Sequence, residues 1–529
     1  MVISVVGTND LHGHIEALPV LGGYLANLRA ARAKDGGAVL LVDAGDMFQG
    51  TLESNLLEGE PVVSAYDALG YAAAAVGNHE FDFGPVGPAA VATEPGQDPR
   101  GALRARAHQA HFPFLMANIV DADTRAIPAW DNVRPTTTVT VDGVEVGIIG
   151  VATEETPYTT MAANVVGLKM RPLAATIRRR AHILRAAGAQ VVIVAAHAGG
   201  ACHDLDHPES LDSCDTSGEI FKVARALTPD DVDLIVAAHT HTGIANDVGG
   251  IPVIESFAYG RAFGRVDLTV DRQRGRVTAH HIFPPQDLCR DPRAASCEPY
   301  DYAGAPVHAD AAIGKLLEPA VAHAHELAAK PIGVTLTGEV RYSYKEESAE
   351  GNLFADLMLA AHPGDVALTN GGGLRAALPA GKLTYGQLYR AMPFDNRFAT
   401  VHLHARDLVN AVAGNLRGSH GVFCLAGVTV TARCDKDKLV VGLMRNGKRV
   451  PDDAELVVVT NDFLASGGDG VFGRLHLPEG AIVRENGPTI RDEMARVLGE
   501  RGGTLDPATL FDPKHPRLSY PGKRPVTCP

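Results

Sequence analysis

In the first half of the chain, short runs of Val, Ile and Ala alternate with stretches of helical periodicity, which predicts an α/β layered fold. Five of the predicted strands end in polar residues. The polar segment that follows each strand is "GTNDLHGH" after Val2–Val6, "DAGDMFQG" after Val39–Val42, "GNHEFD" after Ala73–Val76, His197 after Val191–Ala196, and "HTHTG" after Leu234–Ala238. Because ligands of such sheets bind beyond the carboxyl ends of the strands, these five ends predict one shared site.

The pattern changes between Tyr300 and Pro331, where a loop-like segment precedes a predicted helix that contains one proline. From Ile332 onward a second α/β pattern follows, interrupted by the Gly-rich loops "NGGG" and "SGGDG". A chain of 529 residues is also too long for one ordinary core. We therefore predict an N-terminal domain over 1–304, a connecting helix or hinge over 305–330, and a C-terminal domain over 331–529.

The polar strand ends hold a mixed set of carboxylate, amide and imidazole groups. Asp10 and His12 lie two positions apart, and so do His239 and His241, so each pair points to one side of an extended segment. The full set of candidate ligands is Asp10, His12, Asp46, Asn78, His197, His239 and His241. Such a set suits Zn, Mn, Fe or Ni rather than Ca. It suffices for two ions if one carboxylate bridges them, and two ions can clamp both oxygens of a phosphoryl transfer.

The amino-acid composition and net charge exclude some classes of binding partner. Hydrophobic residues make up 46% of the chain and charged residues 21%, a balance typical of globular proteins, and no apolar run is long enough to cross a bilayer. The formal net charge of −14 argues against a nucleic-acid polymer as partner, because its phosphates would be repelled. A small phosphorylated ligand is still compatible, since a metal ion or an Arg cluster can reverse the field inside one pocket.

The spacing of the seven cysteines predicts the cellular compartment in which the protein is found. Three close pairs are expected to form local disulfides, namely Cys202/Cys214, Cys289/Cys297 and Cys424/Cys434. Disulfides indicate an oxidising environment, periplasmic or extracellular, and in that case we expect an export signal or lipid anchor to have been removed. The alternative is a cytosolic enzyme with scattered thiols; a zinc knuckle does not fit, because no spacing is C-x-x-C. Cys528 is left unpaired in a Pro-rich tail.

The ordered motifs resemble a known family. "TNDLHGH", "DAGDMFQGT", "GNHEFDFG", "AAHAGG" and "AAHTHTG" are similar to the core of the calcineurin-like metallophosphoesterases. "TNGGGLR", "MPFDN" and "TNDFLASGGDGVF" then resemble the C-terminal domain of the 5′-nucleotidase family. The resemblance implies a four-layer αββα sandwich followed by a separate α/β domain. It also implies that a metal-activated water hydrolyses a nucleotide phosphoester, with two divalent ions such as Zn or Mn as cofactors.

The resemblance further implies roles for single residues. One metal would be held by Asp10, His12, Asp46 and His241, and the other by Asp46, Asn78, His197 and His239. His79 matches the family's catalytic histidine, which is not a ligand, and Asp82 matches the residue that orients it. We expect Glu80 to brace the turn, and we expect His14, His203 and His207 to lie outside the site.

The C-terminal motifs supply candidate substrate contacts. Phe394 and Phe463 match the two aromatic positions between which the family stacks a nucleobase. The matching polar positions are Asn370, Arg375, Asn396 and Asp469. One position departs from the family: Glu346 or a neighbour stands where several members carry a phosphate-binding Arg before "GNL". Arg341 and Lys345 are the candidates to replace it.

This departure leaves the cleaved bond open. The alternatives to a 5′-nucleotidase are a 2′,3′-cyclic nucleotide phosphodiesterase with 3′-nucleotidase activity, or a UDP-sugar hydrolase. A thiosulfohydrolase shares the architecture but needs no stacking aromatics. A non-catalytic surface protein would be expected to have lost metal ligands, whereas all seven are present. The sequence therefore favours a nucleotide hydrolase and leaves its metal and oligomeric state open.

Overall fold

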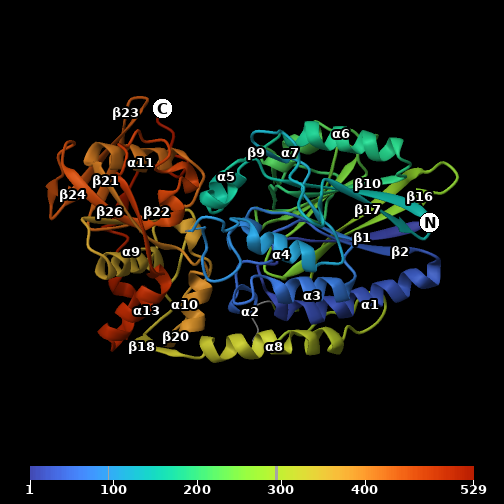
Figure 1. Cartoon of the computed structure of the whole chain (residues 1–529), viewed down its shortest axis with the longest axis horizontal. Coiled ribbons are helices and arrows are strands. Elements are labelled where there is room, and N and C mark those ends of the chain that lie inside the picture. Colours follow the sequence, from blue (N-terminus) through green and yellow to red (C-terminus); the bar gives the residue numbers. More distant parts are fainter. Residues whose placement is uncertain (93, 292–295) are drawn as a thin grey trace. The chain divides into compact units, whose positions relative to one another are not determined.

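The computed structural model describes residues 1–92, 94–291 and 296–529. The chain divides into two compact units, Met1–Ala322 and His323–Pro529 (Figure 1). Helix α8 (Ala311–Ala328), which contains Pro319, spans the point of division. In the described part of the chain, no helix is long and apolar enough to cross a membrane.

Two mixed sheets form the centre of the first unit. One has the strand order β17-β16-β1-β2-β3-β4-β6, and the other has the order β12-β11-β14-β15-β13-β10-β8-β7. The first contains β1 Val2–Thr8, β2 Ala38–Asp43, β3 Ala73–Ala75, β4 Phe114–Leu115, β6 Val133–Arg134, β16 Ala262–Asp271 and β17 Arg276–Asp287. The second contains β7 Thr136–Val141, β8 Val144–Ala152, β10 Val191–His197, β11 Ala201–Cys202, β12 Cys214–Asp215, β13 Leu234–Ala237, β14 Gly243–Val248 and β15 Ile251–Ser256. β5 (Ile119–Asp121) and β9 (Leu168–Met170) pair separately.

The two sheets share one apolar core, to which Val5, Val42, Ile193 and Val236 contribute. Helices cover both outer faces (Figure 1). On the first sheet these are α1 Leu18–Asp35, α3 Glu60–Leu69 and α4 Gly101–Gln109, and on the second α6 Leu173–Ala186 and α7 Glu219–Arg225. Strands buried on both faces read as nearly continuous apolar runs, which is why the sequence pattern was clear. The predicted four-layer αββα sandwich is confirmed.

Parallel pairing brings the polar strand ends together. β1 pairs in parallel with β2, and β2 with β3. In the second sheet β10 pairs in parallel with both β8 and β13. Their carboxyl ends therefore lie at corresponding edges, where short segments take over: η1 Ile15–Ala17, α2 Leu52–Asn55, η2 His79–Phe81, α5 Thr156–Thr159 and η3 Ala162–Val165.

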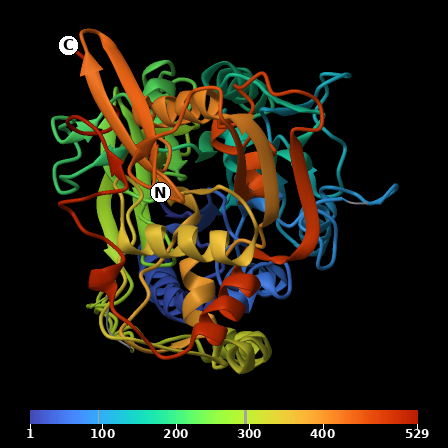
Figure 2. The same cartoon turned by 90° about the vertical axis from the view of Figure 1, so that its left-hand side faces the viewer.

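The second unit is built on a five-stranded sheet of order β22-β19-β26-β21-β27 (Figure 2). Its strands are β19 Val366–Asn370, β21 Arg397–His404, β22 Phe423–Ala426, β26 Glu455–Asn461 and β27 Ile482–Thr489. Smaller sheets contain β18 Pro331–Leu336, β20 Gly381–Thr384 and β28 Thr504–Leu505, and β23 Thr429–Asp435, β24 Lys438–Arg445, β25 Lys448–Arg449 and β29 Leu518–Ser519. The helical segments are α9 Ala349–Ala361, η4 Gly371–Gly373, α10 Tyr385–Ala391, α11 Ala405–Arg417, α12 Asp462–Ala465, η5 Gly468–Gly470, α13 Ile490–Arg501 and η6 Pro507–Thr509. Separate apolar cores lie on the two faces of the central sheet. The predicted second α/β domain is thus confirmed.

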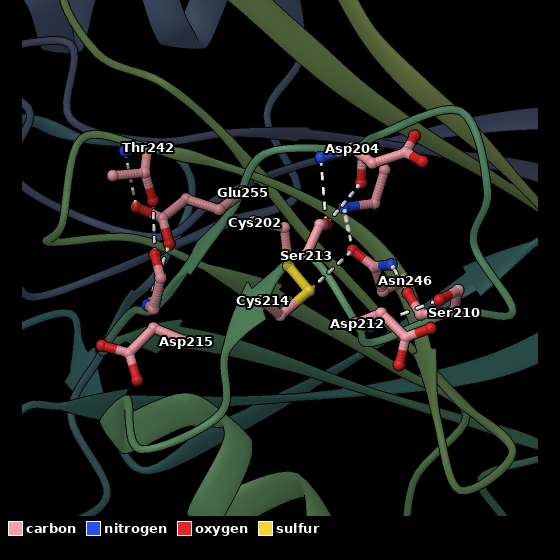
Figure 3. Close-up of a disulfide and its surroundings, with 12 residues drawn as sticks. Cys202, Asp204, Ser210, Asp212, Ser213, Cys214, Asp215, Thr242, Asn246 and Glu255 are labelled. Carbon is pink, nitrogen blue, oxygen red and sulfur yellow. Dashed lines mark hydrogen bonds between the residues drawn. A yellow bond between two sulfur atoms is a disulfide. The ribbon is translucent and has the colours of Figure 1, made fainter.

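The described residues form three disulfides. Cys202–Cys214 joins the directly paired ends of β11 and β12 (Figure 3), and Cys289–Cys297 closes a short loop. Both confirm the predicted pairs. The third prediction was wrong, because Cys434 bonds Cys528 and Cys424 is a buried free thiol. Cys424 lies in β22 within one core of the second unit, whereas Cys434 and Cys528 pack against the core on the other face of the sheet.

Candidate metal centre and substrate contacts

The five polar strand ends of the first unit meet. Asp10, His12 and His241 place one ligand atom each within 4.8 Å of one another, and so do Asp46, His197 and His239. The Oδ1 atom of Asn78 adds to the second group, at 2.9 Å from Nε2 of His197. The structure therefore brings together all seven candidate ligands in two groups, and Asp46, which the resemblance assigns to both metals, lies in the second group.

Sharp turns aim these side chains. Five of the seven residues have left-handed backbone, with φ of 48° at Asp10, 49° at His12, 57° at Asp46, 84° at His239 and 56° at His241. This conformation is uncommon outside Gly, and it clusters at functional sites where the surroundings hold it in place. The turns are held by bonds between strand ends: Asp10 N donates to Gly45 O at 3.0 Å, and His12 N donates to Asp46 O at 3.0 Å.

A glycine makes room for the central carboxylate. A Cβ at Gly77 would lie 2.1 Å from Oδ1 of Asp46. That oxygen accepts the backbone N–H of His79 at 2.9 Å. Gly77 therefore allows the third strand end to approach the second closely enough for this contact.

In the first group, two imidazole nitrogens face each other. Nδ1 of His12 lies 2.7 Å from the carbonyl oxygen of Gln49, to which only a protonated nitrogen can donate. This fixes the tautomer of His12 and leaves a lone pair on Nε2. That Nε2 lies 3.0 Å from Nε2 of His241, which is 3.4 Å from Oδ1 of Asp10. A cation bound between these atoms would be coordinated by all three of them, two imidazole nitrogens and one carboxylate oxygen.

The second group repeats this arrangement. Nδ1 of His197 lies 3.0 Å from the carbonyl oxygen of Ala44, so Nε2 is the ring nitrogen that faces two oxygens. These are Oδ1 of Asn78 at 2.9 Å and Oδ2 of Asp46 at 3.0 Å. Oδ2 of Asp46 is buried and receives no aligned hydrogen bond from any described residue. One imidazole nitrogen and two oxygens that converge in a buried space fit a metal ion.

The electrostatics of the site also favour positive charge. Burial alone would raise the pKa values of Asp10 and Asp46, but neighbouring imidazoles lower both, that of Asp10 to about 2. Burial alone would lower the pKa of His197, but Asp46 and Asp10 raise it to about 10. Burial, with His197 nearby, lowers the pKa of His239 to about 3, so its ring is neutral and able to bind a metal. The two ionised carboxylates thus require a cation beside His197, either a proton or a metal ion.

His79 and Asp82 form a separate pair next to these groups. Nδ1 of His79 donates to Oδ2 of Asp82 at 2.5 Å, and Oδ1 of Asp82 accepts the hydroxyl of Thr160 at 2.7 Å. His79 is 8% exposed, so its ring is enclosed but reachable. The sequence did not indicate a role for Thr160, because a Thr in a loop has no distinguishing pattern.

Buried acids brace the strand-end loops. Glu80 accepts the N–H groups of Met47 (2.7 Å), Asp46 (2.9 Å) and Gly77 (2.6 Å), which ties the second and third strand ends together. It therefore braces the turn, as expected. Glu255 accepts the hydroxyl of Thr240 at 2.7 Å. It also accepts the backbone N–H of Thr242 at 3.3 Å (Figure 3). Its signal in the sequence was a Glu within the apolar strand "IPVIES".

The three histidines expected outside the site take other partners. His14 bonds Glu16, and His207 bonds Asp204 at 2.7 Å in the exposed loop that the Cys202–Cys214 bridge closes. The side chain of His203 is exposed in the same loop. None of them belongs to the two ligand groups found among the described residues.

Four of the six predicted substrate contacts of the second unit form two pairs. Nδ2 of Asn370 donates to Oδ2 of Asp469 at 2.7 Å, and Asp469 has left-handed backbone with φ of 51°. The guanidinium of Arg375 lies over the ring of Phe394, 5.3 Å from its centroid. The ring of Phe463 lies against Gly468, where a Cβ would come within 2.5 Å of it.

Asn396 is buried, 8% exposed, and its backbone carbonyl accepts the N–H of Ile490. Neither candidate for the replaced Arg turns inward: Arg341 is 82% exposed at its side chain and pairs with Glu339, and Lys345 is exposed. Two basic residues that the sequence did not single out lie nearer to the Asn370–Asp469 pair. Nδ1 of His420 is 3.8 Å from Oδ1 of Asp469, and Arg524 bonds the carbonyl oxygen of His420 at 2.8 Å.

Two family models match the chain. Residues 3–243 match the calcineurin-like phosphoesterase model, and residues 321–474 match the model of the 5′-nucleotidase C-terminal domain. The two matches follow the order of the motifs.

The chain is also similar to curated proteins and solved structures. It is 27% identical over 495 residues to the endonuclease YhcR of Bacillus subtilis, covering 88% of this chain but only 37% of that protein. It is 23% identical over 501 residues to a 5′-nucleotidase of Vibrio cholerae, covering 88% and 85% of the two chains. A 5′-nucleotidase precursor from Thermus thermophilus shares the fold with a TM-score of 0.76 at 24% identity, over 98% and 99% of the chains.

Proposed function

Because the chain belongs to the calcineurin-like phosphoesterases that carry a 5′-nucleotidase C-terminal domain, a family of phosphoric ester hydrolases, we propose that it hydrolyses 5′-nucleotides to nucleoside and phosphate. The observation that carries the proposal is the convergence of seven carboxylate, amide and imidazole ligands at the strand ends, with lone pairs aimed at one another. The Vibrio and Thermus relatives, both named as 5′-nucleotidases, support the choice of substrate.

Two divalent ions, Zn or Mn, would be held in this site. The first would take Asp10, His12, Asp46 and His241 as ligands, and the second would take Asp46, Asn78, His197 and His239. Bound there, they would supply a nucleophilic water at neutral pH and positive charge beside the phosphoryl group. Asp46 suits the bridging role, because its Oδ2 lies between His197 at 3.0 Å and His12 at 3.9 Å.

His79 would act on the phosphoryl group as an acid. With Nδ1 donating to Asp82, a protonated ring would present Nε2–H to a phosphoryl oxygen or to the leaving oxygen. Asp82 keeps the ring oriented and stabilises its positive charge, and the hydroxyl of Thr160 holds Asp82. In this role His79 acts as an acid and is not a metal ligand.

The second unit would recognise the nucleoside. The rings of Phe394 and Phe463 would stack on the base, each contributing about 1–3 kcal/mol. Asn370 and Asp469, already bonded to each other at 2.7 Å, would meet the ribose hydroxyls and the base. Arg375 and the buried Asn396 complete the proposed contacts.

The three disulfides support a periplasmic or extracellular location, because such bonds persist in oxidising compartments. The partner we propose is a small nucleotide and no nucleic-acid polymer, given the net charge of −14.

The test is phosphate release by the full chain after it is stripped with chelator and reloaded with Mn or Zn. The substrates are 5′-AMP, 3′-AMP, 2′,3′-cyclic AMP, UDP-glucose and p-nitrophenyl phosphate. We expect metal-dependent turnover highest on 5′-AMP, lowered by Phe463→Leu but unchanged on the aryl ester. A preference for the cyclic nucleotide or the UDP-sugar would identify the other members of the family as the better models. Cleavage of the aryl ester alone would overturn the nucleotide assignment and reopen the thiosulfohydrolase alternative.

A further inference from the structure

The C-terminal tail is fastened at both ends to the second unit. Leu518 and Ser519 form β29, which pairs in parallel with β23. Cys528 bonds Cys434 at the end of β23, and Figure 2 shows the C-terminus beside the hairpin of β23 and β24. Between these points Val526 is buried, and its N–H donates to the carbonyl oxygen of Leu416 at 2.8 Å. The tail is therefore part of the folded unit.

The guanidinium of Arg524, in this tail, binds three backbone carbonyl groups, and we call this set of contacts the clamp. Its Nη2 donates to the carbonyl oxygens of Asn415 at 2.7 Å and His420 at 2.8 Å, and its Nη1 lies 3.3 Å from the carbonyl oxygen of Lys345. The guanidinium thus joins three backbone groups from two segments that are far apart in the sequence. A planar fork with several fixed donors can do this, whereas an ammonium group presents its donors from one point.

The clamped segments form the wall around Asn370. The carbonyl oxygen of Tyr344 accepts the N–H of Val422 at 2.8 Å, and the carbonyl oxygen of Val422 accepts the N–H of Gly371 at 2.7 Å. The fit is close, since a Cβ at Gly421 would lie 2.3 Å from the backbone nitrogen of Gly372. Hydrogen bonds and close backbone contacts therefore join residues 343–345, 415–422 and 370–373.

His420 sits where the clamp meets the proposed nucleoside contacts. Its carbonyl oxygen is held by Arg524, and its ring lies 3.8 Å from Asp469. Asp469 in turn accepts the hydrogen bond of Asn370. A short path of contacts thus runs from the disulfide-held tail to the pair proposed to bind the ribose and base.

We propose that Arg524 is a positioning residue of the nucleoside site, delivered by the tail that Cys434–Cys528 fastens, and that His420 is a further contact of the substrate beside Asp469. The inference rests on the proposed function, and Arg524 lies beyond residue 474, where the family-model match ends. It makes nucleotide recognition, but not phosphoester cleavage, depend on one disulfide.

The test compares Arg524→Met, Arg524→Lys, His420→Ala and Cys434→Ser/Cys528→Ser in the full chain. Matched controls are Arg449→Met, an exposed Arg paired with Asp452, and Cys289→Ser/Cys297→Ser, the short bridge of the first unit. We expect the ratio of kcat/KM for 5′-AMP to kcat/KM for p-nitrophenyl phosphate to fall about tenfold through a higher KM, the loss that a charge-assisted hydrogen bond predicts. The lysine variant should recover only part of the ratio, and the controls should keep it.

A second readout separates this inference from the proposed function. Amide hydrogen exchange should rise in residues 415–422 of Arg524→Met and stay unchanged in Arg449→Met. An unchanged substrate ratio, or unchanged exchange in this segment, would overturn the positioning role. If the unmodified chain cleaves no nucleotide, the proposed function fails, and increased exchange alone would then establish the clamp. Loss of aryl phosphate cleavage in parallel with nucleotide cleavage would contradict a role limited to recognition.

Discussion

Replacing Glu80 with Gln should weaken the candidate metal centre although Glu80 is not among its ligands. The carboxylate receives three backbone N–H groups, one on Oε1 from Met47 and two on Oε2 from Asp46 and Gly77. The amide of Gln has the same shape but only one accepting oxygen. If this oxygen faces Asp46 and Gly77, the NH₂ group faces the N–H of Met47, and that donor is left buried without an acceptor.

The size of the effect follows from this count. An unsatisfied buried donor costs about 1–3 kcal/mol. Partners that orient metal ligands typically change metal affinity about 10–100-fold when they are mutated. We therefore expect the affinity for Zn or Mn to fall within that range and the metal-free chain to unfold at a lower urea concentration.

The assay is competition for the metal with a chromogenic chelator, together with urea unfolding of the stripped protein. Glu16→Gln is the matched control, because Glu16 is 64% exposed at its side chain and pairs with His14 outside the ligand groups. Glu80→Gln with unchanged metal affinity and unchanged unfolding would refute the reasoning, since three short bonds would then contribute nothing.

Three further predictions concern pH, a disulfide and the acid. Burial raises the pKa of Glu350 to about 9, against about 4.3 in an unfolded chain. The fold therefore keeps a proton that the unfolded chain releases, so stability is fully present below pH ~4 and declines toward pH 9 by up to about 1.4 kcal/mol per pH unit. Glu350→Leu should raise the urea midpoint more at pH 8 than at pH 5; equal gains would contradict this. The sequence separation is 94 for Cys434–Cys528 and 8 for Cys289–Cys297. On the chain-entropy model, replacing the first pair with Ser should thus lower the free energy of unfolding by about 4–5 kcal/mol, and replacing the second should lower it by about 2–3 kcal/mol. Equal losses would show that loop length does not determine how much each disulfide stabilises the fold. Asp82→Asn should lower kcat about 100-fold by misorienting His79, with metal content unchanged; a loss of metal instead would make the pair part of the ligand shell.

The sequence was most informative where local pattern and strand topology agree. The apolar runs before Asp10, Asp46 and His197 are buried parallel strands, and parallel strands bring their carboxyl ends to one edge. Their polar neighbours therefore had to meet, and the structure brings them together. Glu80 was also expected to brace the turn, although the three groups that it binds became visible only in three dimensions.

The sequence failed where partners are remote and carry no local signal. Cys424 and Cys434 are ten positions apart, yet they belong to cores on opposite faces of one sheet, so spacing alone gave the wrong pair. Arg524 stands in a Pro-rich tail that reads as a loop, and its partners are backbone carbonyls more than a hundred residues away. Backbone acceptors are the same at every position, so no residue pattern marks them.

The most direct test of the central claim is a metal titration of the stripped full chain, with bound metal and 5′-AMP hydrolysis recorded in the same sample. The two ligand groups predict that activity rises to a maximum at two ions per chain and that Asp46→Asn, which alters the carboxylate proposed to bridge the ions, abolishes it. Full activity with one ion, or two bound ions without hydrolysis of 5′-AMP, would contradict a dinuclear nucleotide hydrolase.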